Sequence, residues 1–319
     1  VYASDTSFVT LTNSGTEVAR LQLTHSNPVM KNNENRFLTY GIGSASYEIS
    51  SFDETLYSGN AENKIYTGDV ASNGTYCLVT EDNGYLTTLY AYSKNNNRIY
   101  KYSFSEYYIT SVAINKDGSG CVATGVSSDK GSAVTGVYVL DFSQEKPVST
   151  YKISGDSVLD CKYLTSDTAV LVGSQASYIV KKGEKNYKTV SYEDKTLSNY
   201  CFNTDTSTYT MALSRSGDGR SVALISYNSN GEAQYTINTE HKADSLSVYK
   251  GTVAILDGNV VYGYNQNGDL LYSTNSGTGS KKIVLASDYT AYILSVNQIR
   301  FIDLDSVSSD DTAQTSKQE

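Results

Sequence analysis

Residues 111–153 read SVAINKDGSGCVATGVSSDKGSAVTGVYVLDFSQEKPVSTYKI, and this stretch decides the fold. It contains four short segments rich in Val, Ile and Tyr, which are residues that favour strands. Polar turns such as Lys116-Asp117-Gly118 separate the segments and supply residues that tolerate positive φ in tight hairpins. The stretch therefore predicts one unit of four antiparallel strands.

The same pattern of strand, polar turn and strand recurs along the chain. It returns as LYAYSKNNNRIYKYSF from Leu89, ALISYNSNGEAQYTI from Ala223 and VVYGYNQNGDLLYST from Val260. A repeat of roughly forty residues indicates a repeat architecture, because one such unit cannot bury its apolar face alone. Short, evenly spaced strands in units of this length predict an all-β fold, the β-propeller.

The number of blades depends on the two terminal fragments, residues 8–23 and 281–304, which are incomplete units. We expect them to pair, because an open sheet edge is costly, giving seven four-stranded blades closed by both termini. The alternative keeps the fragments apart and gives eight blades. In either case residues 1–305 form a single propeller domain. Residues 306–319 form a disordered polar tail.

The charge of the chain limits its partners. The formal net charge is −9 and the pI is about 4.8, which argues against nucleic acid and against an anionic membrane surface. The acidic excess serves solubility or attracts a basic protein or a cation. No apolar run approaches the ~20 residues of a membrane span. Because the sequence starts at Val1 and not at Met, we expect that a signal peptide or N-terminal anchor has been removed.

The cysteines and histidines do not predict a metal or cofactor site. The cysteines follow the repeat with spacings of 44, 40 and 40 residues: Cys77, Cys121, Cys161 and Cys201. None forms a close zinc-type pair, and sheets ~10 Å apart are too distant for a disulfide, so four free thiols are expected. A Cys161–Cys201 bridge is the alternative. His25 and His241 fall in loops of different units and are not expected to share a metal.

The candidate binding face consists of the loops that join the last strand of one unit to the first strand of the next. These loops are expected to meet at the mouth of the channel, where a concave site forms. Tyr107 and Tyr108, beside Glu106, are the strongest candidates for ligand contact, because a tyrosine ring stacks while its hydroxyl stays wet. The whole predicted face is Glu106, Tyr107, Tyr108, Asp156, Asp160, Glu193, Asp194, His241 and Asp244.

Three stretches carry a resemblance to a known family: FVTLTNSGTEVARLQLTHSNPV from Phe8, RFLTYGIGSASYEI from Arg36 and VAINKDGSGCVATGVSSDKGSAVTGVYVLDF from Val112. They resemble a family of uncharacterised β-propellers of Gram-positive bacteria, a domain of unknown function. The chain is more generally similar to WD40- and YVTN-type propellers, although it has no Trp and so no Trp-Asp dipeptide. The resemblance implies an extracellular propeller held at the cell surface by an N-terminal membrane anchor, and it supplies no catalytic residues.

These observations predict a binding or scaffold propeller and not an enzyme. No catalytic residue is predicted, because the sequence contains no recognisable combination of catalytic residues. The partner is expected to be another protein or a cell-surface glycan. The alternative is a hydrolase or lyase that acts on polysaccharide through carboxylates at the channel mouth, since such chemistry needs two carboxylates about 5–10 Å apart.

Overall fold

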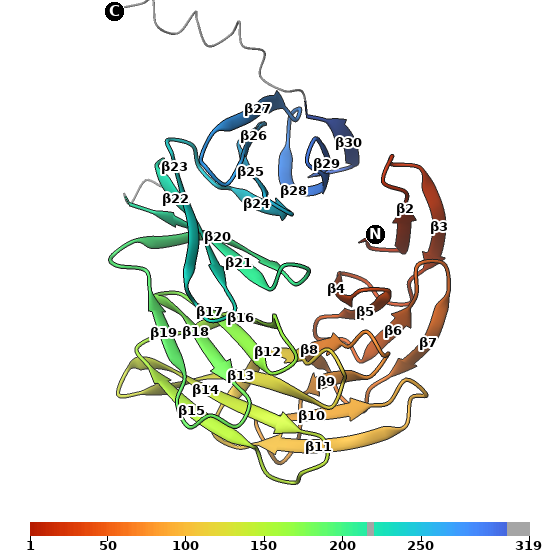
Figure 1. Cartoon of the computed structure of the whole chain (residues 1–319). Helices are drawn as coiled ribbons and strands as arrows, with labels where there is room; N and C mark the ends of the chain where they lie inside the picture. The colour runs from red at the N-terminus through yellow and green to blue at the C-terminus, as the bar shows by residue number, and fades with distance from the viewer. Residues whose placement is uncertain (216–219, 305–319) are drawn as a thin grey trace, which may run out of the picture. The chain divides into compact units, whose positions relative to one another are not determined.

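The computed structural model describes residues 1–215 and 220–304 (Figure 1). Every regular element within these residues is a β-strand, so the all-β prediction is confirmed. The predicted tail, residues 306–319, lies outside the described residues. In the part of the chain that is described, no helix has the length and apolar character needed to cross a bilayer.

The strands form eight antiparallel sheets, and each sheet joins strands that are consecutive in the chain. The chain divides into two units. The first unit consists of Val1–Thr12 and Thr16–Ser191, and the second contains Asn13–Gly15 and the chain from Tyr192 onward.

The first unit contains five sheets. The N-terminal sheet consists of β1 (Tyr2–Ala3), β2 (Ser7–Leu11) and β3 (Glu17–Gln22). The second consists of β4 (Pro28–Asn33), β5 (Arg36–Gly41), β6 (Ser46–Ser50) and β7 (Thr55–Asn60). The third consists of β8 (Ile65–Val70), β9 (Tyr76–Thr80), β10 (Thr87–Tyr92) and β11 (Arg98–Phe104). The last two consist of β12 (Tyr108–Ile114), β13 (Gly120–Asp129), β14 (Ser132–Asp141) and β15 (Ser149–Ser154), and of β16 (Val158–Tyr163), β17 (Thr168–Gly173), β18 (Ala176–Lys181) and β19 (Lys188–Ser191).

The second unit contains the remaining three sheets. The first of them consists of β20 (Thr196–Asn203), β21 (Thr208–Ser214), β22 (Val222–Asn228) and β23 (Ala233–Thr239). The next consists of β24 (Ser245–Tyr249), β25 (Thr252–Asp257), β26 (Val260–Tyr264) and β27 (Leu270–Asn275). The C-terminal sheet consists of β28 (Ser280–Ser287), β29 (Thr290–Ser295) and β30 (Ile299–Asp303).

The prediction of seven blades with a shared terminal sheet is wrong, and the alternative of eight is confirmed. The N-terminal fragment is not a pair of strands, because the short β1 pairs with β2 and places Tyr2 opposite Val9. It is therefore a three-stranded sheet, and so is the C-terminal fragment. Six strands cannot complete one four-stranded blade, so each fragment stands as a sheet of its own.

Burial along the strands explains their composition. The second strands β9 and β17 are buried at every position, whereas the fourth strand β7 alternates between exposed and half-buried residues. Strands that are covered on both faces should be apolar at every position, and outer strands need not be. The predicted turns also form, with φ near +70° at Gly118 and +89° at Gly268.

Candidate functional site

A pocket of about 480 Å³ lies in the first unit, between the sheet β8–β11 and the sheet β12–β15. Two residues of the predicted binding face, Glu106 and Tyr107, lie on its wall. The walls come from β11, from the loop after it, and from β14 and β15; they consist of Tyr102, Ser103, Phe104, Ser105, Glu106, Tyr107, Val137, Tyr138, Thr150, Tyr151 and Lys152. The recess is thus built from third and fourth strands and one loop between sheets, whereas the prediction placed the site where several such loops meet at a channel mouth.

Two glycines in the strand interiors position Tyr107. Gly125 of β13 lies opposite Gly136 of β14, and the ring of Tyr107 lies against Gly136. A Cβ atom at Gly136 would be 2.5 Å from Cδ2 of Tyr107, and one at Gly125 would be 3.0 Å from its Cβ. This contact between the two glycines and Tyr107 was not predicted from the sequence, although a glycine inside a strand often marks a close approach of this kind. The signal is the repeated Thr-Gly-Val in VATGV and AVTGV.

Aromatic rings pack around Tyr138 at the wall of the pocket. Its ring meets Phe104 edge-to-face at 4.9 Å between centroids, and it meets Tyr107 in the same way at 6.1 Å. Tyr102 lies 6.0 Å from it in a tilted arrangement. Burial and then the charge of Glu106 raise the pKa values of Tyr102 and Tyr138, so both hydroxyls stay protonated at neutral pH.

The two charged side chains of the pocket differ in their surroundings. The ammonium of Lys152 donates to Asp129 at 3.0 Å, and this hydrogen bond raises the pKa of Lys152. Glu106 is exposed and, across the described residues, forms no ion pair. The pocket therefore has one neutralised cation and one carboxylate without a counter-charge.

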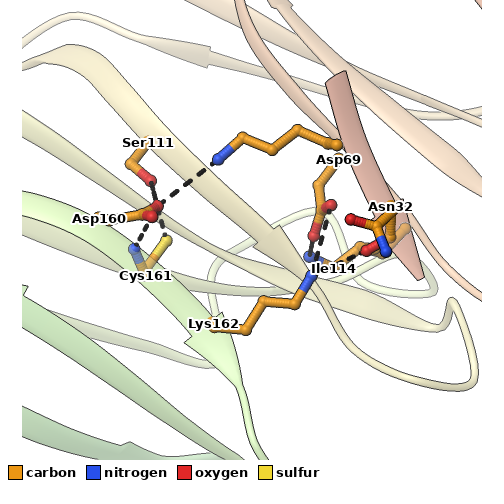
Figure 2. Close-up of polar contacts among 8 residues, drawn as sticks. Asn32, Asp69, Ser111, Ile114, Asp160, Cys161 and Lys162 are labelled. Atoms are coloured by element: carbon orange, nitrogen blue, oxygen red, sulfur yellow. Dashed lines mark hydrogen bonds and ion pairs between the residues drawn. The ribbon is translucent and has the colours of Figure 1, made fainter. Parts of the chain in front are cut away.

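A second cluster of charges links the first strands of three sheets of the first unit, and we call Lys31, Asp69, Asp160 and Lys162 the first-strand network (Figure 2). Lys31 of β4 lies 3.6 Å from Asp160 of β16, measured from Nζ to Oδ1. Lys162 of β16 lies 3.9 Å from Asp69 of β8 and donates to the backbone oxygen of Asn32 at 3.3 Å. Each lysine thus reaches from its own sheet to an aspartate of another.

Backbone and hydroxyl donors complete the network. Ile114 N of β12 donates to Asp69 at 3.0 Å, and the Asp69 side chain is only 2% exposed. Ser111 Oγ and Cys161 N donate to Asp160 at 3.2 and 2.9 Å (Figure 2). Burial alone would lower the pKa of Lys31, but the charges of Asp160 and then Asp69 raise it above its usual value.

The network was only partly anticipated from the sequence. Asp160 was predicted as a loop residue facing a channel mouth, but it lies inside β16, directly after a bulge between Val158 and Asp160. A bulge sits at the same place in β8 and β12, and bulges re-aim the side chains that follow them. Such bulges cannot be read from one sequence, because they follow from strand pairing.

Two further predicted residues of the first unit lie away from the pocket wall. The Asp156 carboxylate is buried and accepts from the turn between β17 and β18, from Ser174 N at 2.8 Å and Ala176 N at 3.2 Å, and from the Tyr178 hydroxyl at 2.8 Å. It therefore holds a turn in place. Tyr108 starts β12, is 52% exposed, and is not among the residues that line the pocket.

The remaining four predicted residues belong to the second unit. Glu193 binds Lys195 at 2.9 Å, and Asp194 lies beside it with a φ of +65°. His241 stacks on Tyr262 with 3.5 Å between ring centroids, and Asp244 accepts from Gly258 N at 3.0 Å. Each of these contacts lies within one sheet and its adjoining loops.

Cysteines and histidines offer little reactive chemistry. All four cysteines are free, three of them buried and Cys201 half-buried. Burial raises the pKa of Cys121, and it raises that of Cys161 to about 12, so these thiols are poor nucleophiles at neutral pH. His25 is buried and burial lowers its pKa. Within residues 1–215 and 220–304, His, Cys, Asp and Glu form no group that could hold a metal ion.

Comparisons with known proteins agree with this architecture. Residues 1–304 match a family described as a family of unknown function, DUF5711, whereas no curated protein matches. The C-terminal WD40 domain of Sif2 is similar with a TM-score of 0.61 and 15% identity, over 85% of this chain and 78% of that one. BamB from Moraxella catarrhalis is similar with a TM-score of 0.57 and 12% identity, over 88% of both chains. Hsv2 from Kluyveromyces lactis is similar with a TM-score of 0.59 and 11% identity, over 89% of this chain and 94% of that one. At such identities the likeness shows the β-propeller fold alone, and that prediction is confirmed.

Proposed function

The chain belongs to the DUF5711 family, whose function is unknown, and it has a β-propeller fold; on this basis we propose that it is a binding or scaffold module and not an enzyme. The observation that carries the proposal is the pocket of about 480 Å³, on whose wall Glu106 and Tyr107 lie. Rigid sheets that hold a concave site between them suit recognition, because they fix the site before a ligand arrives.

The geometry favours binding over polysaccharide hydrolysis. Hydrolysis by paired carboxylates needs two of them about 5–10 Å apart. Glu106 is the one carboxylate among the described residues that line the pocket. Of the other predicted carboxylates in this unit, Asp156 accepts hydrogen bonds from the turn between β17 and β18, and Asp160 is paired with Lys31. The hydrolase alternative would therefore need a second carboxylate from elsewhere.

We further propose that the partner is another protein or a cell-surface glycan and that binding takes place outside the cell. Tyrosine rings with hydroxyls, as in this pocket, suit either class of partner. The net charge of −9 disfavours nucleic acid. The extracellular location and the N-terminal anchor are supported by the resemblance to surface-anchored propellers.

Capture from a surface extract of the producing cell, with the protein immobilised, tests the proposal. We expect Tyr107→Ala to reduce capture of the specific partner and Tyr108→Ala to retain it, because of these two residues only Tyr107 lines the pocket. Equal capture by both variants would show that recognition occurs elsewhere. Release of sugars from a surface polysaccharide that is lost in Glu106→Gln would favour the hydrolase alternative.

A further inference from the structure

The uncompensated charge of the pocket is the starting point. Lys152 has its counter-charge in Asp129, whereas Glu106 has no cationic partner among the described residues. Exposed ion pairs are weak, but a carboxylate at the wall of a recess exerts its field on whatever enters. Glu106 and Lys152 on the wall cancel in charge, but Asp129 beside Lys152 adds a second carboxylate, so the charges at the pocket sum to −1 and favour a cation.

The walls of the same pocket are aromatic. Five of the eleven lining side chains have aromatic rings: Tyr102, Phe104, Tyr107, Tyr138 and Tyr151. The four tyrosines are half-buried, so part of each ring is accessible. A cation within about 6 Å of the face of such a ring is attracted by its quadrupole, and aromatic cages use this attraction to hold quaternary ammonium groups.

We propose that the pocket binds an organic cation, an ammonium group with alkyl substituents, through Glu106 and the rings of Tyr102, Tyr107 and Tyr138. The ammonium comes either from a small quaternary amine or from a lysine side chain of a partner protein. The inference rests on the proposed function in that both assign recognition to this pocket. A volume of about 480 Å³ lies within the usual 300–1,000 Å³ of ligand pockets and admits such a head group with its chain.

Glu106 separates this ligand class from a neutral sugar. A sugar would use the rings and hydroxyls of the pocket without needing the Glu106 charge, whereas an ammonium group needs both. The tyrosine hydroxyls stay neutral at physiological pH, because burial and the Glu106 charge raise the pKa values of Tyr102 and Tyr138. They can accept hydrogen bonds from an N–H group without adding charge.

Calorimetric titration of the full chain tests the proposal with three probes. Choline represents a free quaternary amine, and Nα-acetyl-lysine methylamide represents the lysine of a partner. The neutral isostere of choline, 3,3-dimethyl-1-butanol, has the same shape without charge. We expect one or both cations to bind with Kd near or below ~1 mM, and the isostere to bind at least about tenfold more weakly. The cation that binds more tightly identifies the source of the ammonium group.

Two carboxylate variants provide the matched comparison. Glu106→Gln should weaken the binding of the preferred cation by about tenfold. Glu145→Gln changes the net charge equally, but at an exposed site outside the pocket, and should leave that binding unchanged. Both residues are exposed, so both variants should fold, which far-UV circular dichroism checks. Binding of the isostere as tight as that of the preferred cation, equal affinity of the two variants for that cation, or no binding of either cation at ~10 mM would each overturn the proposal.

The capture experiment separates this inference from the proposed function. Capture that requires Tyr107 but is unchanged in Glu106→Gln, and is unaffected by excess choline or lysine probe, would refute the cation and leave the binding role intact. Cation binding that requires Glu106, combined with capture that ignores Tyr107→Ala, would leave the cation site intact and refute the pocket as the partner site.

Discussion

The pocket and the first-strand network both contain lysines and carboxylates, but the charges are balanced in the network and a carboxylate is left over in the pocket. In the network, two lysines and two aspartates neutralise one another, and backbone and hydroxyl groups also donate to the aspartates. In the pocket, Lys152 is paired outside the recess with Asp129, and Glu106 has no cationic partner in the described part of the chain. Charges that cancel within the chain hold sheets together, whereas a charge left over beside aromatic rings is available to a ligand.

The largest difference between the two regions should appear in stability when each loses a carboxylate. Asp69→Ala should reduce the free energy of unfolding by about 3 kcal/mol, because it leaves Ile114 N without an acceptor and the partly buried Lys162 without its counter-charge. Glu106→Ala should leave it unchanged, since Glu106 has no ion pair with any described residue to lose. Urea denaturation measures both. Similar losses in the two variants would remove the distinction between the regions.

A methyl group at Gly136 should displace the Tyr107 ring at the wall of the pocket. Gly136→Ala places a Cβ 2.5 Å from the Tyr107 ring, so the ring must move or β14 must shift. We expect a loss of about 1–3 kcal/mol in stability, as for other overpacked sites, together with loss of partner capture. Gly155→Ala provides a contrast, because a Cβ there meets no atom within 4 Å; its φ of +81° strains the backbone but leaves the pocket untouched. Capture that survives in Gly136→Ala would mean that the position of Tyr107 does not matter.

Two adjacent tyrosines, Tyr107 on the pocket wall and Tyr108 outside it, should differ in their effect on binding. Tyr107→Ala should weaken the binding of a specific partner by at least about 1 kcal/mol, whereas Tyr108→Ala should change it little. Asp69→Asn, made in the network, should also leave affinity unaltered as long as the protein is folded. Affinities measured by calorimetry decide the matter, and a larger effect of Tyr108 than of Tyr107 would reverse the assignment.

The smallest effect is expected at a third ion pair, between Asp141 at the end of β14 and Lys182 after β18. The hydrogen bonds from Lys182 and then Ser143 lower the pKa of Asp141 from 3.8 to about 2. A carboxylate with a depressed native pKa stabilises the fold above pH ~4, and that contribution is lost as pH falls towards 2. Asp141→Asn should therefore cost less than about 1 kcal/mol at pH 7, because the pair is partly solvated, and clearly less at pH 2, where about half of the native carboxyl groups are protonated. Chemical denaturation at the two pH values measures this, and an equal cost at both would exclude the charge as its cause.

The sequence anticipated only part of the candidate site. The position of Tyr107 and Glu106 between two repeat units marked them as loop residues, and both lie on the wall of the pocket. The other rings, such as Tyr138 and Tyr151, were indistinguishable from the many tyrosines that pack between sheets. Asp69 and Lys162 gave no signal either, because their partners lie far away along the chain and on another sheet. Asp69 is 93 residues from Lys162, and Asn32 is 130 residues from Lys162.

The sequence by itself determined the all-β fold and the propeller class, because both follow from local patterns: strand-forming residues, polar turns and a period of roughly forty residues. It left the blade number open, since only the pairing of the two-residue β1 with β2 made the N-terminal fragment a complete sheet. The tertiary structure alone decided that Gly125 and Gly136 seat Tyr107, and that lysines cross between sheets to neutralise Asp69 and Asp160. These contacts join residues from different strands, and one chain read in order does not specify which strand faces which.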